Sequence, residues 1–285
     1  LFLASVAAQT SRIRLGTAII TLPMENALRV AEDAAVLDLL SQQRLELGLG
    51  SGGTPTSFLP FGLTFDERAA AFEANLATLL QAWAGGALGD EDNRLYPAAP
   101  LLGERLWQAT FSVAGAARAG AAGHGLMLSR TQPRPAASPH LPLDEIQNPL
   151  IDAYLNALPP GMTPRILASR TAFVSRDGAE ARRLALPGLT AQAAQHRAAG
   201  HPVSGTTLDD YIAAFDVHTG TPQQVVASLQ LDSALNRVTD VSFQVHSIDP
   251  PHDQILTSIE LLATEVAPAL GWRPPVTAHS HKETV

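Results

Sequence analysis

Short apolar runs that favour β-strands alternate with helical patterns along this chain of 285 residues. Helical spacing of apolar residues is clearest over residues 27–40 and 66–83. The runs that we predict to be strands are residues 12–20, 44–50, 105–110, 125–129, 165–175 and 241–246. This alternation is typical of a mostly parallel sheet flanked by helices. A doubly wound open sheet and a (β/α)8 barrel both fit it.

The predicted strands are fewer than a complete barrel contains. A full barrel needs two more β/α units, or about 60 residues at roughly 30 residues each. The sequence starts LFLASVAAQT, without a methionine and with the character of an interrupted helix, so we expect residues to precede Leu1. Our prediction is an α/β fold, a TIM (β/α)8 barrel over residues 1–272 that lacks its first one or two β/α units.

Two segments stand apart from this pattern. Residues 131–143 carry four prolines and no hydrophobic period, which predicts a mobile insertion loop over residues 131–144. Such a loop is either a surface linker or a lid over a site. After Trp272 the sequence turns polar and contains prolines, and we predict a frayed polar tail over residues 273–285.

Charge and composition exclude several classes of function. The net charge is −8 and no basic cluster is longer than Arg182-Arg183, so we expect no nucleic-acid partner. The chain has no cysteine, which excludes disulfides, thiolate metal sites and cysteine nucleophiles. No apolar run reaches the ~20 residues of a membrane helix, and the first residues lack the basic flank of a signal peptide. These features predict a cytoplasmic protein without membrane contact.

The segment LELGLGSGGT, residues 45–54, matches two nucleotide-binding motifs at once. Its glycines spell GxGxxG, which is typical of dinucleotide binding. Glu46 with the alternating glycines spells the acidic-GxGxG pattern of methyltransferases that use S-adenosylmethionine. Both motifs require a helix directly after the glycine turn. Pro55 and Pro60 prevent a continuous helix there, and the next helical pattern begins near Asp66. We therefore interpret the glycines as a loop at the exit of a strand.

Two strand exits are candidates for binding an anion such as a phosphate. At the first, Gly50 and Gly52 let the backbone approach a ligand, and Ser51 adds a hydroxyl beside exposed N–H groups. At the second, a short strand leads into TFSVAGAA, where Ser112 can cap a helix whose start attracts anions. Without a ligand, the first exit would be a plain βα turn, and Ser112 would simply cap its own helix.

His246 ends the last predicted strand, at a position that faces the active site in a barrel. It is a weak candidate for a general base, and the alternative is a polar residue that closes the barrel mouth. His246, Asp249 and His252 together suggest a metal cluster, but a strand end and a Pro-Pro turn hold three ligands poorly, so no metal is expected. His218 is expected in a loop near the rim.

Several segments resemble the bacterial luciferase-like flavin-dependent monooxygenases. The resemblance is strongest over residues 10–62, where RIRLGTAIITLP is similar to the third strand of that family and RLELGLGSG to its fourth. Later, GTPQQV at residues 220–225 resembles the start of a helix in the family, and EVAPAL at residues 265–270 resembles its final helix. The resemblance covers most of the chain.

This resemblance implies a TIM barrel that carries FMN or, as in some relatives, a deazaflavin. It places an irregular or cis peptide near Ala18 and Ile19, against the flavin ring. It also implies a phosphate site at the two strand exits, formed by Gly50, Ser51, Gly52, Thr110, Phe111 and Ser112. The family commonly has an arginine where this chain has Ser51, and Arg130, at the end of a predicted strand, is our candidate to replace its charge.

The activity implied is that of a flavin-dependent monooxygenase that uses reduced FMN and O2 on a small organic substrate. A histidine of the family lies near the end of its second strand, which would precede Leu1. The family also implies a homodimer and, in some relatives, a separate flavin reductase. Two alternatives stay open. One is a methyltransferase that uses S-adenosylmethionine, with a helix that starts at residues 51–55. The other is a non-catalytic flavin-binding relative.

Overall fold

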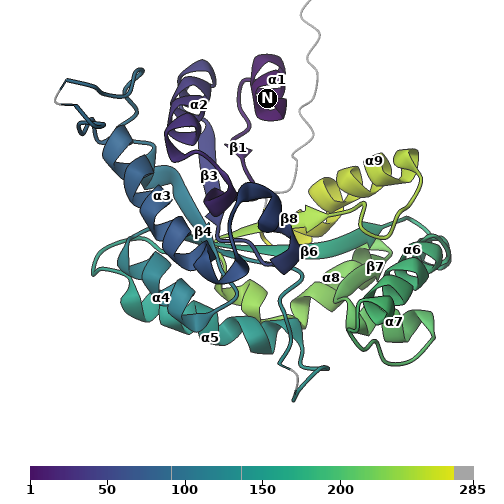
Figure 1. Cartoon of the computed structure of the whole chain (residues 1–285). Coiled ribbons are helices and arrows are strands. Elements are labelled where there is room, and N and C mark those ends of the chain that lie inside the picture. Colours follow the sequence, from purple (N-terminus) through teal and green to yellow (C-terminus); the bar gives the residue numbers. More distant parts are fainter. Residues whose placement is uncertain (91, 136, 273–285) are drawn as a thin grey trace, which may run out of the picture. The chain divides into compact units, whose positions relative to one another are not determined.

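The structure is a computed structural model that describes residues 1–90, 92–135 and 137–272. The chain divides into two compact units, whose elements are labelled in Figure 1. Unit 1 contains Leu1–Leu128 and Pro149–Leu167, and unit 2 contains Ser129–Asn148 and the chain from Ala168 onward. The tail predicted over residues 273–285 lies outside the described residues.

Unit 1 is a parallel sheet with helices packed against it. Its strands are β1 (Leu15–Gly16), β2 (Ile20–Thr21), β3 (Leu45–Gly50), β4 (Leu106–Ala109) and β5 (Gly125–Leu128). Strand β3 pairs with β1, β2 and β4, and β4 pairs with β5. Its helices are α1 (Phe2–Gln9), α2 (Ala27–Leu40), α3 (Arg68–Trp83) and α4 (Val113–Ala121). Helices α2 and α3 lie side by side in Figure 1 and contact each other.

The core of unit 1 follows from the apolar spacing of β3 and its helices. Asn26 caps α2 by accepting hydrogen bonds from two backbone N–H groups of the first turn. Leu45, Leu47 and Leu49 alternate along β3 and are buried in one cluster with α2 and α3. Trp83 is also buried there, and its indole N–H donates to a backbone carbonyl of α2 at 3.1 Å. The helices predicted over residues 27–40 and 66–83 and the strand predicted over residues 44–50 are confirmed.

The single strand predicted over residues 12–20 is interrupted. Leu15 pairs with Leu45 in β1, whereas Ile20 pairs with Leu49 in β2. Between the two short strands, residues 17–19 lie opposite residues 47–48, so the outer strand holds one extra residue. This is the arrangement of a β-bulge, which bends a strand and turns its side chains.

Unit 2 contains the remaining strands and helices. They are β6 (Ile166–Val174), α6 (Gly178–Ala198), α7 (Leu208–Ala214), β7 (Val217–Gly220), α8 (Pro222–Gln230), β8 (Asp240–Gln244) and α9 (His252–Leu261). Helix α9 continues through a π-helical turn into α10 (Ala267–Ala269). Helix α5 (Leu143–Ala157) and strand β6 cross the boundary between the units. Helices α6 and α7 contact each other and β7, as Figure 1 shows.

Strand β7 corrects one expectation. It pairs in parallel with β6, with His218 opposite Ala172. His218 was expected in a rim loop, but it lies on this strand and is buried. The sequence VHTG has too few β-branched residues in a row to mark a strand.

The structure establishes an α/β fold with parallel strand pairing in unit 1 and between β6 and β7. Strand β8 pairs with β6, whereas strands of a complete barrel pair in sequence order. Closure of the barrel and the single-domain boundaries therefore stay predictions. None of the helices in the described ranges has both the length and the apolar character to cross a bilayer.

Candidate functional site

The break between β1 and β2 is held by a side chain. The Thr17 hydroxyl donates to the carbonyl oxygen of Gly48 at 2.9 Å and accepts from the Gly48 N–H at 2.8 Å. This hydroxyl thus takes the place of the backbone groups that a regular ladder would use. A Cβ on residue 48 would lie 2.5 Å from the backbone carbonyl oxygen of Thr17 and 2.7 Å from that of Ala18. Glycine is therefore required at position 48 by the bulge.

The other glycines of the LELGLGSGGT segment also have protein neighbours. A Cβ on Gly50 would approach the Ile19 side chain to 3.0 Å, and one on Gly53 would approach the Phe111 ring to 3.1 Å. Gly52 has φ +82°, and a Cβ there would lie 2.8 Å from the Phe58 ring. Close packing at the strand exit therefore explains the glycines.

No α-helix follows this glycine turn. Three short 3-10 turns, Pro55–Ser57, Leu59–Phe61 and Phe65–Glu67, separate it from α3. The dinucleotide and methyltransferase motifs need a helix start to hold their ligand. The geometry that the methyltransferase alternative predicted at residues 51–55 is thus missing from this described part of the chain.

The second strand exit leads directly into α4. Ser112 accepts a hydrogen bond from the Gly115 N–H at 3.1 Å, and the Thr110 hydroxyl accepts from the Ser112 N–H at 3.1 Å. A Cβ on Gly115 would lie 2.1 Å from the Thr110 hydroxyl, so the turn needs glycine there. Ser112 therefore caps its own helix, and the hydroxyl of Thr110 braces the turn that precedes it.

The two strand exits lie next to each other in unit 1. Gly50, the last residue of β3, pairs with Ala109, the last residue of β4. Backbone N–H groups at both exits donate to no group of the described chain; they belong to Gly52, Gly53, Val113 and Ala114. Free N–H groups at the start of a helix and at a glycine turn form an anion-binding surface.

Below these exits, the same face of the sheet carries a polar cluster. Glu46 lies two and four residues before Gly48 and Gly50, on the same face of β3. It accepts a hydrogen bond from the Trp107 indole N–H at 2.7 Å and forms an ion pair with Arg14 at 2.9 Å. The Arg165 guanidinium lies 5.0 Å from the centre of the Trp107 ring. This cluster lies toward the start of β3, on the side of Gly48 away from the strand exit.

In unit 2, Arg130 and His246 belong to one hydrogen-bonded network. Arg130 donates from Nε to the side-chain oxygen of Gln244, and from a terminal nitrogen to the Thr171 hydroxyl at 3.2 Å. The Gln244 amide nitrogen lies 3.0 Å from Nε2 of His246. Burial lowers the pKa of Arg130. His246 is exposed.

Two other histidines are buried in structural positions. In unit 1, His124 is 8% exposed and accepts a hydrogen bond at Nδ1 from Gln108, at 2.8 Å. In unit 2, His218 lies 2.8 Å from the Ser228 hydroxyl of α8. Burial lowers the pKa of each ring to about 4, helped by the charge of Arg165 for His124. Both rings are thus neutral near pH 7.

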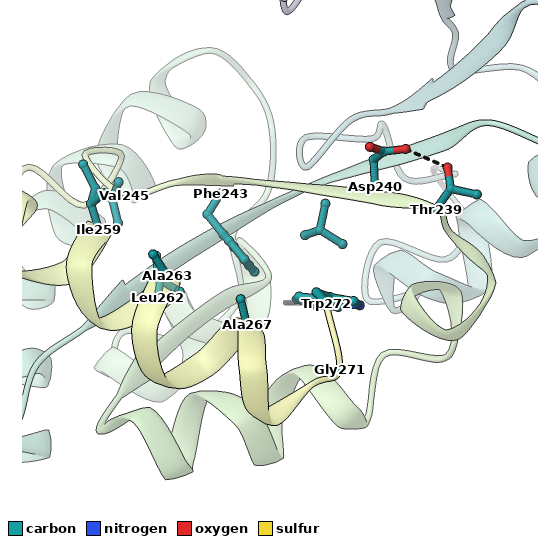
Figure 2. Close-up of a pocket in the computed structure, with 11 residues that line it drawn as sticks. Thr239, Asp240, Phe243, Val245, Ile259, Leu262, Ala263, Ala267, Gly271 and Trp272 are labelled. Carbon is teal, nitrogen blue, oxygen red and sulfur yellow. Dashed lines mark hydrogen bonds between the residues drawn. The ribbon is translucent and has the colours of Figure 1, made fainter. Parts of the chain in front are cut away.

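A cleft of about 570 Å³ in unit 2 lies away from this network. It is formed by β8, α9 and the turns that follow α9, as Figure 2 shows. Val241 and Phe243 line it from β8, Val245 lines it from just after that strand, and Trp272 lines another side. Side chains alternate along a strand, so Gln244 points to the opposite face. The cleft is lined by Thr239 and Asp240 but not by Arg130, Gln244 or His246.

The structure sorts the predicted site residues into two groups. Unit 1 brings together Ala18, Ile19, Gly50, Ser51, Gly52, Thr110, Phe111 and Ser112 around the broken strand and the two exits. Unit 2 holds Arg130 and His246. The Ala18–Ile19 peptide is trans, because the cis bond of the described chain is Tyr96–Pro97, and it lies in the interrupted segment between β1 and β2. In the described ranges no three His, Asp or Glu side chains are placed to hold a metal ion.

Sequence reasoning missed Thr17 and Gln244. Thr17 lies in the middle of an apolar strand pattern, where a threonine is ordinary. Gln244 is two residues from His246, a spacing that places both on one face of a strand. That spacing was a usable signal, but the Arg130 partner is far away in the sequence.

Unpaired N–H groups at adjacent strand exits of an α/β sheet also occur in enzymes that bind phosphate-bearing ligands. Residues 1–231 match the family of luciferase-like monooxygenases. The chain belongs to this family, which confirms the resemblance seen in the sequence and supports an oxidoreductase.

Solved structures show the same fold. Monooxygenase RslO1 of Streptomyces bottropensis is 27% identical, with a TM-score of 0.73 over 94% of this chain and 82% of its own. The oxygenating constituent of 3,6-diketocamphane monooxygenase of Pseudomonas putida, in complex with FMN, is 18% identical, with a TM-score of 0.68 over 94% of this chain and 82% of its own. A coenzyme F420-dependent tetrahydromethanopterin reductase of Methanopyrus kandleri is 18% identical, with a TM-score of 0.61 over 93% of this chain and 86% of its own.

Curated relatives match over shorter segments. The 4-hydroxyprotoasukamycin monooxygenase of Streptomyces nodosus subsp. asukaensis is 41% identical over 63 residues, which is 22% of this chain and 17% of that protein. The matches to the first curated relatives span 26% and 23% of their lengths.

Proposed function

We propose that this protein is a flavin-dependent monooxygenase that binds FMN through the two strand exits of unit 1. The observation that carries the proposal is the set of unpaired N–H groups of Gly52, Gly53, Val113 and Ala114 on adjacent exits. Family membership and a related structure with FMN bound support the choice of ligand.

These backbone N–H groups are hydrogen-bond donors of the kind that bind a phosphate. Neutral N–H donors at a helix start bind phosphate without a cation, because the helix dipole adds partial positive charge. Ser51 makes no hydrogen bond to the described chain, so its hydroxyl is available as a further donor. The arginine common at this position in the family is absent, so the phosphate would be held by neutral groups of unit 1. Arg130 stays a candidate for the missing charge.

The broken strand supports a place for the flavin ring. The bulge exposes Ala18 and Ile19, and the Ile19 side chain, 45% exposed, lies beside Gly50. An exposed apolar side chain next to a glycine exit offers a flat surface for an aromatic ring. Bound flavin would supply the redox chemistry with O2, and these residues would orient it and exclude water from one face.

Removal of a single N–H donor tests this site. Val113 is the first residue of α4, where proline is tolerated, and Ser112 before it is extended, as a residue before proline must be. We expect Val113→Pro to weaken FMN binding by about tenfold, the effect of one lost hydrogen bond to a charged group. Riboflavin, which lacks the phosphate, should bind the wild-type protein and Val113→Pro with the same affinity. Val113→Ala keeps the N–H group and is the matched control.

Flavin fluorescence measures these affinities, and oxygen consumption with reduced FMN tests the activity. Equal losses for FMN and riboflavin in Val113→Pro would contradict the phosphate site. Tight FMN binding without oxygen consumption would favour the non-catalytic flavin-binding alternative. Binding of a deazaflavin in preference to FMN would favour the cofactor of the reductase relative. A homodimer and a separate flavin reductase belong to the same proposal.

A further inference from the structure

The network of Arg130, Gln244 and His246 fixes the direction of each of its hydrogen bonds. An arginine guanidinium can only donate, so the Gln244 atom that faces Arg130 Nε is the side-chain oxygen. The amide nitrogen of Gln244 therefore faces His246, and this nitrogen can only donate. It follows that Nε2 of His246 accepts a hydrogen bond and carries no proton.

The anchor of this network is well held. Arg130 is fixed at a second point by its hydrogen bond to the Thr171 hydroxyl, and Thr171 on β6 is 3% exposed. The amide of Gln244 cannot reverse without placing two donors against each other at Arg130. Thr171 is thus buried, Arg130 and Gln244 are half-buried, and the His246 ring at the end of the network is exposed.

A neutral imidazole carries one proton, on one of its two nitrogens. With Nε2 as acceptor, the proton must be on Nδ1. The free position of the ring is then a hydrogen-bond donor. This differs from the general base considered for His246 from sequence, which would need a free unprotonated nitrogen.

We propose that Gln244 is a positioning residue for His246, whose ring it holds with Nε2 as the acceptor and Nδ1–H as the free donor. The geometry of the ring is a property of the flavin-free protein.

The test is the tautomer of His246, measured by long-range 1H–15N correlation NMR on the full chain without flavin. At about pH 8.5, well above the ordinary imidazole range, we expect protonated Nδ1 and unprotonated Nε2. The signals are assigned by their loss in His246→Asn. Because no flavin is added, the result does not depend on whether FMN binds.

Two substitutions of Gln244 separate positioning from simple packing. Gln244→Glu has the same shape but can only accept, so the ring should move its proton to Nε2 or become charged. Gln244→Met removes the donor at similar length, and the Nε2–H tautomer should become populated. Gln223→Met, an exposed glutamine of α8, should leave the His246 signals unchanged.

Circular dichroism checks that each variant is folded. If Gln244→Met is unfolded, the NMR spectrum of the wild-type protein alone decides the test. An Nε2–H tautomer in the wild-type protein would overturn the proposal. So would wild-type signals in folded Gln244→Glu. A shifted tautomer in both Gln244 variants, with Gln223→Met unchanged, would establish it.

Discussion

The Thr17 hydroxyl donates to the Gly48 carbonyl and accepts from the Gly48 N–H, so one side chain completes the backbone pairing of a broken strand. This contact allows the extra residue between β1 and β2 without unpaired backbone groups on β3. It also explains why position 48 has no side chain. The irregular strand and the glycine at position 48 therefore belong to one structural feature.

Gly48→Ala should be strongly destabilising. Its methyl group would lie within 2.7 Å of two backbone oxygens, which cannot move without opening the bulge. We expect a loss of about 1–3 kcal/mol in the free energy of unfolding, measured by urea denaturation. Gly16→Ala is the matched control, because the nearest atom to its Cβ is 3.8 Å away. Equal stabilities of the two variants would show that the bulge is not rigid.

Glu46 should matter more than an ordinary surface carboxylate. It is hydrogen-bonded to Trp107 and paired with Arg14, and its side chain is 13% exposed. Glu46→Leu leaves the buried indole N–H without a partner, which costs about 1–3 kcal/mol of unfolding free energy. Thermal or urea unfolding measures this loss. Glu32→Leu, which breaks the exposed Arg29 pair, should change stability by less than about 0.5 kcal/mol. Similar effects of the two substitutions would contradict this role of Glu46.

Local patterns predicted most of the helices and strands of unit 1. Helices α2 and α3 have long apolar periods with clear boundaries, and β3 is a continuous apolar run. Local patterns could not predict the break at Thr17, because it depends on a hydroxyl that bonds to residue 48 on another strand; only the family resemblance placed an irregularity nearby, at Ala18 and Ile19. Strand β7 was missed because it has four residues, of which two are β-branched and separated by His218, and so short a pattern carries too little signal.

The candidate site was predictable in part. Glycine and serine at strand exits pointed to Ser51 and Ser112, since the chemistry of such turns is local. The role of Gln244 depends on Arg130, which is 114 positions away in the sequence. No local pattern indicates such a partner. The structure was also needed to show that Ser112 uses its hydroxyl as a cap, which leaves the backbone N–H groups as the free donors.

The buried histidines should make the protein acid-sensitive. The pKa of His124 and of His218 falls from 6.5 to about 4 in the folded chain. Between these values the unfolded chain binds protons that the folded chain does not, so stability is present above pH 6.5 and is lost as the pH falls toward 4. Each ring contributes about 3 kcal/mol across this range.

Urea denaturation at several pH values measures this dependence. His124→Asn keeps a side-chain oxygen that can accept from Gln108, so it should reduce the slope of stability against pH by about 1.4 kcal/mol per pH unit within the window. His252→Asn changes an exposed residue and should leave the slope as it is. An unchanged slope in His124→Asn would mean that the ring is already protonated in the folded chain.

Arg170 should be among the most sensitive positions of unit 2. Its side chain is fully buried and donates to Asp232 at 2.6 Å and to Gln147 at 2.9 Å. Removing this side chain leaves Asp232 without its cation. Arg170→Met should therefore lower the free energy of unfolding by about 3–5 kcal/mol, because an unpaired carboxylate stays buried. Arg182→Met breaks an exposed pair with Asp209 and is the control, with an expected change below about 0.5 kcal/mol. Adding Asp232→Asn to Arg170→Met removes the buried charge and should restore part of the loss. If the double variant is no more stable than Arg170→Met, the cost comes from lost packing and not from the unpaired charge.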